Sequence, residues 1–420
     1  MRARIPGPVR TAARALGLPL AEVTRYWYDE RSALQRGLAA LGVGLLATLV
    51  AGVVLGSATE RLEALPGLLL LIPAAIGMRG SNFGALAARL GTGIHTGEFE
   101  IELARRNFFG RQIEAAAILT FTSSAGIAVL AWFVGRAFGV RAALGQLVVI
   151  SVVGGLLSSV VLVGVTIVLA RQAYLRGWNM DDVGAPAITA TGDLVTLPAL
   201  LLASLLVEVP GMTATLGVAG VLAGGWALWR GWRHPQPDVR RIVRESVVVL
   251  TLAATVDIFA GTVVESRAEQ FFDVPALLIL VPPFIAASGS LGGILASRLA
   301  SKLHLGLMEP RALPGKIAAL DVSVTLVFAV TAFAGVGAVT RLAAELIGRA
   351  SPPLPQLLAI TSFGGLLAFA LLSAVAYAAA TATYRFGLDP DNHSIPIVTA
   401  TMDLLGVLCL VAGIALVRME

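Results

Sequence analysis

Two aspartates stand inside long apolar segments of this chain, where an ionised side chain is energetically costly. Asp193 lies eleven residues beyond Asp182, and Asp403 lies eleven residues beyond Asn392. At 1.5 Å per residue, this spacing puts each carboxylate roughly 17 Å along a helix, near the middle of a bilayer. A charged carboxylate in lipid costs about 3 kcal/mol, so such residues face a bundle interior or an aqueous cavity and usually mark an ion pathway. The alternative is a protonated or hydrogen-bonded aspartate with a structural role.

The residues around both aspartates supply further oxygen atoms. Thr189 and Thr191 in the first segment recur as Thr399 and Thr401 in the second, within a turn of each aspartate. Hard cations such as Mg²⁺ prefer oxygen ligands and keep several waters, so two carboxylates with nearby hydroxyls could hold a hydrated ion. The single cysteine, Cys409, excludes a cysteine-rich metal site. The pattern predicts divalent-cation binding, with Mg²⁺ as a transported ion and no cofactor.

More acidic residues precede both segments. Asp181 and Asp182 stand before the first, and Asp389 and Asp391 stand before the second. Such carboxylates could concentrate cations at the mouth of a path. They could equally be loop residues or helix N-caps. The sequence leaves both interpretations open.

The helices that must position these residues can be read from composition and hydropathy. The chain has 420 residues, 57% of them hydrophobic and 14% charged. A mean hydropathy of +0.84 excludes a water-soluble domain of this size. Apolar runs bounded by charged residues predict an all-α polytopic membrane protein with about eleven transmembrane helices. These lie near 38–56, 65–90, 113–135, 145–170, 185–207, 212–229, 246–264, 274–299, 317–340, 355–381 and 394–417.

The distribution of basic residues predicts an orientation. With the N-terminal tail, residues 1–36, on the cytoplasmic side, the inside segments hold 23 Lys and Arg and the outside segments hold 7. This bias favours a multi-pass protein of the cell membrane with a cytoplasmic N-terminus. It also explains the formal charge of +5 without a nucleic-acid partner. The tail has no apolar stretch typical of a signal peptide.

Two segments of the first half recur in the second. At an offset of 209, the residues Pro66, Pro73, Gly80, Ser81, Gly84, Arg89, Leu90, His95 and Gly97 recur as Pro275, Pro282, Gly289, Ser290, Gly293, Arg298, Leu299, His304 and Gly306. At an offset of 210, the residues Tyr174, Gly177, Asp181, Pro186, Thr189, Thr191 and Asp193 recur as Tyr384, Gly387, Asp391, Pro396, Thr399, Thr401 and Asp403. The chain therefore reads as a duplicated five-helix unit.

The duplication predicts the domain organisation. The first five-helix membrane repeat covers residues 37–208, a linker helix with a basic loop covers 209–244, and the second repeat covers 245–420. Because five is odd, the extra helix restores the second repeat to the orientation of the first, so the repeats are predicted to be parallel. Equivalent residues could then face each other across a path at the repeat interface, and a monomeric pseudo-dimer could suffice.

The second helix of each repeat is interrupted by Pro, Gly and Ser, over 73–84 and 282–293. This favours a broken helix whose backbone lines a cavity, and the alternative is close helix packing through small residues. Arg79 within the first of these segments either pairs with a carboxylate or gates the path, and its counterpart is Ser288. Asp257 in the seventh predicted helix has Thr48 as its counterpart.

The chain resembles the MgtE-type magnesium transporters and, more closely, the solute carrier family 41, in which two such membrane units are fused. The segment PAAIGMRGSNFGALAARL resembles the second-helix motif of the family, and NMDDVGAPAITATGDLVTL and LDPDNHSIPIVTATMDLLG resemble its fifth-helix motif. The resemblance implies that Asp193 and Asp403 coordinate hydrated Mg²⁺ and that Asp181 and Asp391 are the acidic residues of the loop motif.

The chain departs from the family pattern in the second-helix motif. The asparagine that follows the motif glycine is replaced by Ser81 and Ser290, and Asn82 stands one place later in the first half only. The resemblance implies that these three side chains are candidate cation ligands.

Two other classes of function are alternatives to magnesium transport. A membrane-embedded Mg²⁺-dependent enzyme of the prenyltransferase type needs aspartates clustered one helical turn apart to hold metals against a diphosphate, and the acidic residues here are spaced differently. A transporter for another divalent cation or for an anionic or organic solute is the other alternative. In the anionic case Arg79 would bind the solute, but every other basic residue lies at the end of a predicted span or outside the spans.

Overall fold

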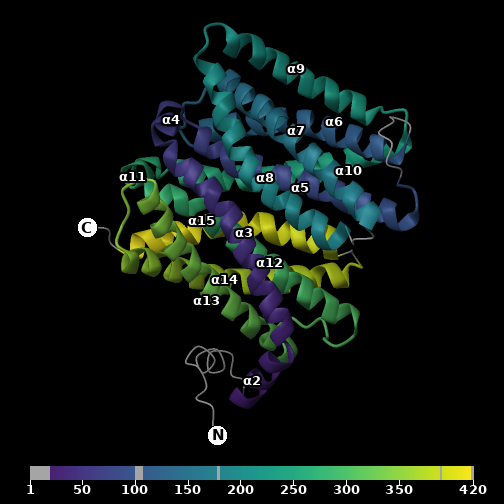
Figure 1. Ribbon diagram of the computed structural model, residues 1–420, viewed down its shortest axis with the longest axis vertical. Helices are drawn as coiled ribbons and strands as arrows, with labels where there is room; N and C mark the ends of the chain where they lie inside the picture. The colour runs from purple at the N-terminus through teal and green to yellow at the C-terminus, as the bar shows by residue number, and fades with distance from the viewer. Residues whose placement is uncertain (1–18, 100–106, 177–179, 388–389, 418–420) are drawn as a thin grey trace. The chain divides into compact units, whose positions relative to one another are not determined.

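The computed structural model describes residues 19–99, 107–176, 180–387 and 390–417, and every regular element in these ranges is a helix (Figure 1). The all-α prediction is confirmed. The helices are α2 (Leu20–Asp29), α3 (Arg31–Ser57), α4 (Thr59–Ala64), α5 (Leu68–Thr96), α6 (Phe108–Ala137), α7 (Leu144–Arg176), α8 (Met180–Ser204), the 3₁₀ helix η1 (Leu205–Glu208), α9 (Met212–Trp232), α10 (Pro237–Glu265), α11 (Ala268–Asp273), α12 (Pro275–His304), α13 (Lys316–Leu346), α14 (Leu354–Arg385) and α15 (Pro390–Leu416).

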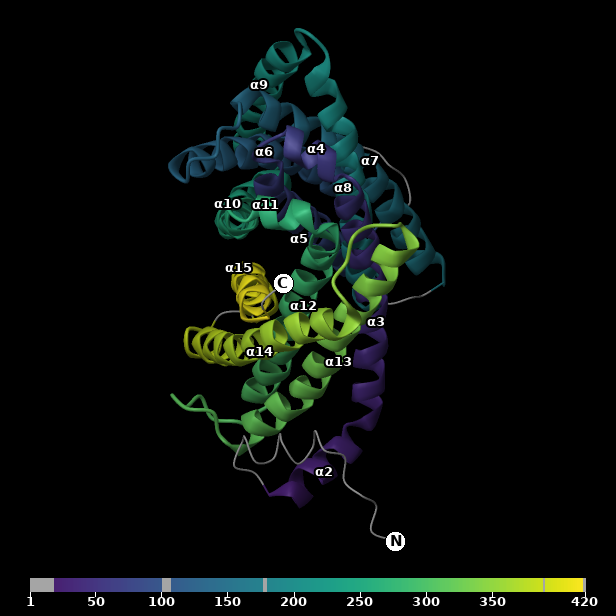
Figure 2. The ribbon, with the colours of Figure 1, turned by 90° about the vertical axis from the view of Figure 1, so that its left-hand side faces the viewer.

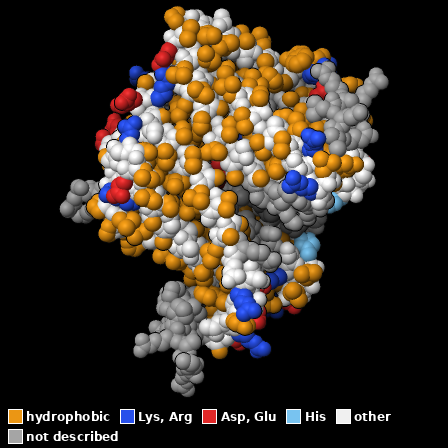
Figure 3. Space-filling model, in the orientation of Figure 1, with side chains coloured by type: hydrophobic (Ala, Val, Ile, Leu, Met, Phe, Trp, Pro, Cys, Tyr) orange, Lys and Arg blue, Asp and Glu red, His pale blue; other side chains and the backbone are white. Residues whose placement is uncertain are grey.

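Eleven helices of the described chain are long and apolar enough to cross a membrane, which confirms the predicted number. Large apolar side chains on these helices remain exposed, among them Val160 at 72%, Leu222 at 67% and Leu252 at 66%. Hydrophobic side chains are spread over the face drawn in Figure 3, with few charged side chains among them. An apolar exterior of this extent requires lipid as its solvent, so the protein is a multi-pass membrane protein.

The chain forms two compact units. Unit 1 comprises residues 1–53 and 274–420, and unit 2 comprises residues 54–273. In unit 2, α5 packs on α6, α7, α8 and α10, while α9 lies on α6 and α7. In unit 1, α12 packs on α13, α14 and α15, and α14 also packs on α15 (Figure 2). In both units, therefore, the second helix of the repeat is a central element that contacts the helix carrying the aspartate.

Within unit 2, the linker helix α9 packs on its neighbours through a row of glycines. Gly217 lies against Gly145 of α7, and Gly224 lies against Ala125 of α6. Small residues at these positions let the helix backbones approach closely, and in lipid this close packing is a main source of helix association.

The compact units do not coincide with the sequence repeats, because each unit takes its first helix from the other repeat. Gly52 of α3 lies against the backbone of Ile279 in α12, so an added Cβ would collide with the Ile279 carbonyl oxygen. Gly261 of α10 lies in the same way against Leu70 of α5. An offset of 209 relates Gly52 to Gly261 and Leu70 to Ile279. The two crossings are therefore equivalent, and each requires glycine because backbone occupies the place of a side chain.

Substitution of Gly261 by Ala is expected to destabilise the protein by about 1–3 kcal/mol, because the methyl group would be forced into the Leu70 backbone. The matched control is Gly44→Ala in α3, where an added Cβ meets nothing within 4 Å. That change should be neutral or stabilising by up to about 1 kcal/mol, because alanine favours helix. Thermal unfolding of the purified variants measures both values, and equal melting temperatures would contradict the packing at Gly261.

The prediction of broken second helices is wrong. Helix α5 runs without interruption from Leu68 to Thr96 with Pro73 inside it, and α12 runs from Pro275 to His304 with Pro282 and Pro283 inside it. The small residues serve close packing instead: an added Cβ at Gly292 would lie 2.7 Å from the side chain of Val398 in α15. Neighbouring helices make proline tolerable in a membrane span, so its presence did not require a break.

The amphipathic helix α2 docks on unit 1 through a buried carboxylate. Asp321 of α13 is fully buried, and it forms ion pairs with Arg298 at 2.8 Å and with Lys302 at 2.6 Å. The hydroxyl of Tyr26 in α2 donates a hydrogen bond to Asp321 Oδ1 at 2.7 Å, and Arg298 also reaches Glu30 at 3.1 Å. Burial, together with the hydrogen bond to Asp321, raises the pKa of Tyr26, so the phenol stays protonated.

Candidate cation site

Asp193 is half-buried on α8, next to the point where this helix crosses α5. An added Cβ at Gly192 would lie 3.9 Å from the backbone nitrogen of Gly80, so two glycines meet where the helices touch. This contact holds the carboxylate-bearing turn of α8 beside the Gly-Ser motif of α5. Within the described residues, Asp193 forms no ion pair, so its charge is not already neutralised by a nearby Arg or Lys there.

Asp403 is half-buried at the equivalent position of unit 1, on α15 where it packs against α12. An added Cβ at Gly289 would lie 3.3 Å from Asp403 Oδ1 and 3.8 Å from the carbonyl oxygen of Thr399. Glycine at this position therefore leaves space for the carboxylate on the surface of α12. Each unit thus packs the aspartate-bearing turn against the motif glycine of its own second helix, through Asp403 itself in unit 1 and through the adjacent Gly192 in unit 2.

The threonines near the aspartates differ in exposure. Thr189 is exposed and Thr399 is half-buried. The methyl group of Thr189 lies toward Gly80, at 3.8 Å from an added Cβ there. The hydroxyl of Thr191 donates to the carbonyl of Ala187 in its own helix at 2.7 Å, which is an ordinary contact for threonine within a span.

The motif side chains that follow the glycines lie in two different environments. Ser81 and Ser290 are exposed. Asn82 is only 2% exposed, and its Nδ2 donates to the Ala116 carbonyl at 3.2 Å and to Thr120 Oγ1 at 3.3 Å. Asn82 thus faces α6, whereas the serines face outward from their own units.

The acidic residues at the proposed mouth can be placed only along the chain. Asp181 lies in the first turn of α8 and Asp391 in the first turn of α15, and their side chains fall outside the described part of the structure. Asp389 falls outside the described residues altogether. Among the described residues, no group of three or more His, Cys, Asp and Glu side chains is close enough to hold a metal ion.

Two further charged residues lie deep within unit 2. Asp257 of α10 is 2% exposed, and its Oδ2 would lie 2.6 Å from a Cβ added at Gly77 of α5. Arg79 is 1% exposed, and its Nη2 donates to Ser124 Oγ of α6 at 2.6 Å. Arg79 forms no ion pair with a carboxylate among the described residues, so the pairing that the sequence allowed is not seen there.

The sequence analysis did not identify the residues that accommodate Arg79. A Cβ added at Gly155 of α7 would collide with the Arg79 guanidinium and lie close to Ser124 Oγ, so the charged group depends on this glycine for space. A signal was available in the duplication, because Ser124 corresponds to Phe333 and Ser288 to Arg79. In the first half the large side chain is on the second helix and the small one on the third. In the second half this order is reversed.

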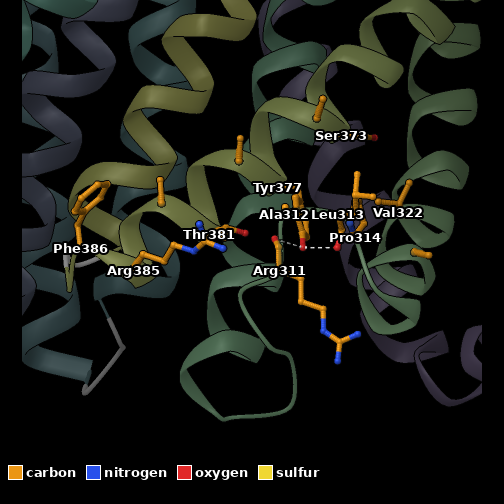
Figure 4. A pocket seen from close by; sticks show the side chains of 14 residues that line it. Arg311, Ala312, Leu313, Pro314, Val322, Ser373, Tyr377, Thr381, Arg385 and Phe386 are labelled. Atoms are coloured by element: carbon orange, nitrogen blue, oxygen red, sulfur yellow. Dashed lines mark hydrogen bonds between the residues drawn. The ribbon is translucent and has the colours of Figure 1, made fainter.

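A cavity in unit 1 lies apart from Asp403, which is not among the residues that line it. It has a volume of about 690 Å³ and lies between α13, α14 and the loop before α13. Figure 4 shows Tyr377 extending from α14 to this loop, with hydrogen bonds from its hydroxyl to the carbonyl oxygens of Arg311 at 2.9 Å and Leu313 at 3.0 Å. The described residues that line it include no carboxylate and are mostly apolar, so they offer no acidic ligand to a divalent cation.

Comparison with known proteins supports the duplicated organisation. The family model for MgtE, described as a divalent cation transporter, matches the chain twice, over residues 72–203 and 281–413. Each match contains most of the second helix and the aspartate of one repeat. No solved structure matches the chain.

Curated relatives are similar to the chain over most of its length. Solute carrier family 41 member 3 of Rattus norvegicus is 24% identical over 358 residues, which cover 81% of this chain and 77% of that protein. Solute carrier family 41 member 2 of Xenopus laevis is 23% identical over 371 residues, covering 80% and 63%. The Homo sapiens member 2 is 24% identical over 369 residues, covering 80% and 62%.

The family consists of transporters rather than enzymes, so the prenyltransferase-type interpretation is set aside. Two family matches that together span more than half of the chain, on an all-helical fold with eleven candidate spans, identify the protein. The chain belongs to the MgtE family of divalent cation transporters.

Proposed function

We propose that this chain carries Mg²⁺ across the membrane along a path to which Asp193 and Asp403 each contribute a carboxylate. The observation that carries the proposal is the equivalent placement of the two residues. Each is half-buried at mid-span on a helix that packs against the motif glycine of the second helix in its own unit. Gly192, next to Asp193, approaches Gly80, and Asp403 itself approaches Gly289. A carboxylate kept in such a place within a membrane protein is typical of an ion pathway.

The chemistry of the site favours a hydrated ion over a fully coordinated one. Mg²⁺ dehydrates reluctantly and is usually held by one or two carboxylates through a shell that keeps several waters. Two aspartates suffice for this, with the hydroxyls of Thr189, Thr399, Ser81 and Ser290 as acceptors for the water shell. Asp181 and Asp391, at the starts of the aspartate-bearing helices, would raise the local cation concentration. Mg²⁺ is then cargo, and no cofactor is required.

The repeats are proposed to be parallel, with an approximate two-fold axis along the membrane normal. This follows from the odd number of helices in each repeat and the additional helix α9 between them. Two equivalent aspartates on such an axis would serve one ion path, and a single chain would then be sufficient for transport.

The test is uptake of divalent cations into proteoliposomes that contain the wild-type protein. Mg²⁺ uptake above that of protein-free vesicles is expected, and Ca²⁺ should compete weakly because it favours six to eight direct oxygen ligands. Mn²⁺ and Co²⁺ form the closest alternatives. Uptake of one of these without Mg²⁺ would reassign the cargo within the same family, and absence of any divalent uptake would refute the proposal.

The N-terminus is proposed to be cytoplasmic, as the distribution of Lys and Arg indicates. In a Cys409→Ala background, Glu63→Cys should react with an impermeant thiol reagent applied outside intact cells, and Glu309→Cys should not. Both glutamates are exposed, so access depends on the side of the membrane alone. The reverse labelling pattern would invert the topology.

A further inference from the structure

A buried arginine in unit 2 has hydrogen-bond donors without partners. Arg79 is 1% exposed, and Nη2 is occupied by Ser124 Oγ at 2.6 Å. Its Nε and Nη1 have no hydrogen-bond partner among the described residues. Fully buried arginines are rare unless a counter-charge is present, because desolvation of a lone guanidinium costs several kcal/mol.

A second unpartnered donor lies on the neighbouring helix. An added Cβ at Gly192 of α8 would lie 4.0 Å from Arg79 Cβ, which places this face of α8 against the arginine. Thr196 lies one turn further along the same face and is fully buried. Its hydroxyl has no hydrogen-bond partner among the described residues. The buried groups without partners are therefore a guanidinium and a hydroxyl, and both can donate hydrogen bonds.

The nearby carboxylates do not supply the counter-charge by direct contact. Asp257 packs against α5 at Gly77, two residues before Arg79 and so about 200° away around the helix. Asp193 is on the helix that contacts Arg79, but the two side chains form no ion pair. The positive charge of Arg79 is thus left without a carboxylate at bonding distance in the described chain.

Unit 1 shows that the fold does not need a charge at this place. Ser288 stands where unit 2 has Arg79, and its hydroxyl bonds to the Phe284 carbonyl of its own helix at 2.9 Å. The ring of Phe333 lies against Gly365, as the guanidinium lies against Gly155. Gly406 stands at the position of Thr196, and a Cβ added there would lie 3.0 Å from Ser288 Oγ. In unit 1 the ring of Phe333 fills the space that the guanidinium takes in unit 2, and Gly406 replaces Thr196. The helices of unit 1 therefore pack here without these two donor groups.

We propose that Arg79 and Thr196 bind a small monovalent anion, such as chloride, in the interior of unit 2. One negative charge neutralises one guanidinium, and Nε–H, Nη1–H and the Thr196 hydroxyl are the donors that a halide accepts. The enclosure of Arg79 restricts the site to a small ion. A water molecule could accept from the same donors, but it would leave the charge uncompensated.

The anion would also affect the cation path, and this consequence rests on the proposed function. Asp193 lies next to Gly192, which contacts Arg79, so a guanidinium without a counter-ion would repel a cation approaching that carboxylate. With the anion bound, the pair is neutral. Mg²⁺ uptake should therefore be faster in chloride than in gluconate.

The test compares the thermal stability of the purified protein in sodium chloride and in sodium gluconate at equal ionic strength. The wild type is expected to melt roughly 3 °C or more higher in chloride, with a saturating dependence on concentration. The Arg79→Ser, Ser124→Phe double variant copies the packing of unit 1 and should lose this difference. Arg341→Gln, which removes an arginine outside the site, controls for general salt effects and should keep it.

A milder variant covers the case in which the double variant does not fold. Thr196→Val removes one donor with little change of shape and should require about tenfold more chloride for the same stabilisation. Equal melting of the wild type in the two salts, or an unchanged chloride effect in Thr196→Val, would overturn the anion site. Because these readouts do not involve flux, they remain decisive if Mg²⁺ transport itself is not observed.

Discussion

Replacing Asp193 or Asp403 by Asn is expected to lower the initial rate of Mg²⁺ uptake at least ~10-fold, because each substitution removes a full negative charge that attracts the ion in a low-dielectric span. Asn keeps the size and the hydrogen-bonding capacity of the side chain, so the packing at Gly192 and Gly289 should persist. Uptake into proteoliposomes, normalised to reconstituted protein, measures the effect.

The double variant discriminates one path from two. If both carboxylates act on the same ion, the Asp193→Asn and Asp403→Asn effects should not multiply, because residues that act as a unit are non-additive. Asp273→Asn, outside the candidate spans, is the matched control and should leave uptake unchanged. Each single variant retaining about half of the wild-type rate would instead indicate two independent pathways.

Asp321→Asn is expected to lower the free energy of unfolding by about 3 kcal/mol, because it leaves Arg298 and Lys302 without the carboxylate they share. The side chain of Asp321 is fully buried, whereas the two cations are about one-fifth exposed, at 19% and 18%. The loss should therefore lie toward the lower end for a buried ion pair. Unfolding of the purified protein, followed thermally or by denaturant, measures it.

The control for Asp321 is an exposed ion pair in the same unit. Arg311 and Glu309 are 68% and 74% exposed, so Arg311→Gln should change stability by less than about 0.5 kcal/mol. Unit 2 gives a second reference, because Gln112 holds Arg89 there at 2.8 Å and no lysine shares it. A neutral side chain therefore stands where one cation is present, and a carboxylate stands where two are. If Asp321→Asn were as stable as the wild type, α2 would not depend on this carboxylate.

The sequence was sufficient to predict the spans and the duplication. The eleven apolar runs needed only length and hydropathy, since a helix must bury some twenty apolar residues to cross the bilayer. The two family matches fall on the halves that the repeated Pro, Gly and Asp positions had indicated. The aspartates were found by their depth and by their recurrence at an offset of 210, and both are properties of the linear sequence.

Features that depend on contacts between distant segments could not be read in the same way. Gly52 and Gly261 look like ordinary small residues until the backbones of Ile279 and Leu70 are placed against them. Pro73 suggested a break, but its helix continues because neighbouring helices support it. Arg79 was visible, but the space it occupies is defined by Gly155, 76 residues later.

The initial rate of Mg²⁺ uptake into proteoliposomes shows whether the two aspartates lie on the ion path, when the wild type is compared with the Asp193→Asn, Asp403→Asn double variant at equal protein content. Uptake by the wild type is expected to be well above that of protein-free vesicles, and uptake by the double variant close to it. Wild-type uptake that persists in a folded double variant would contradict the assignment of the aspartates to the ion path.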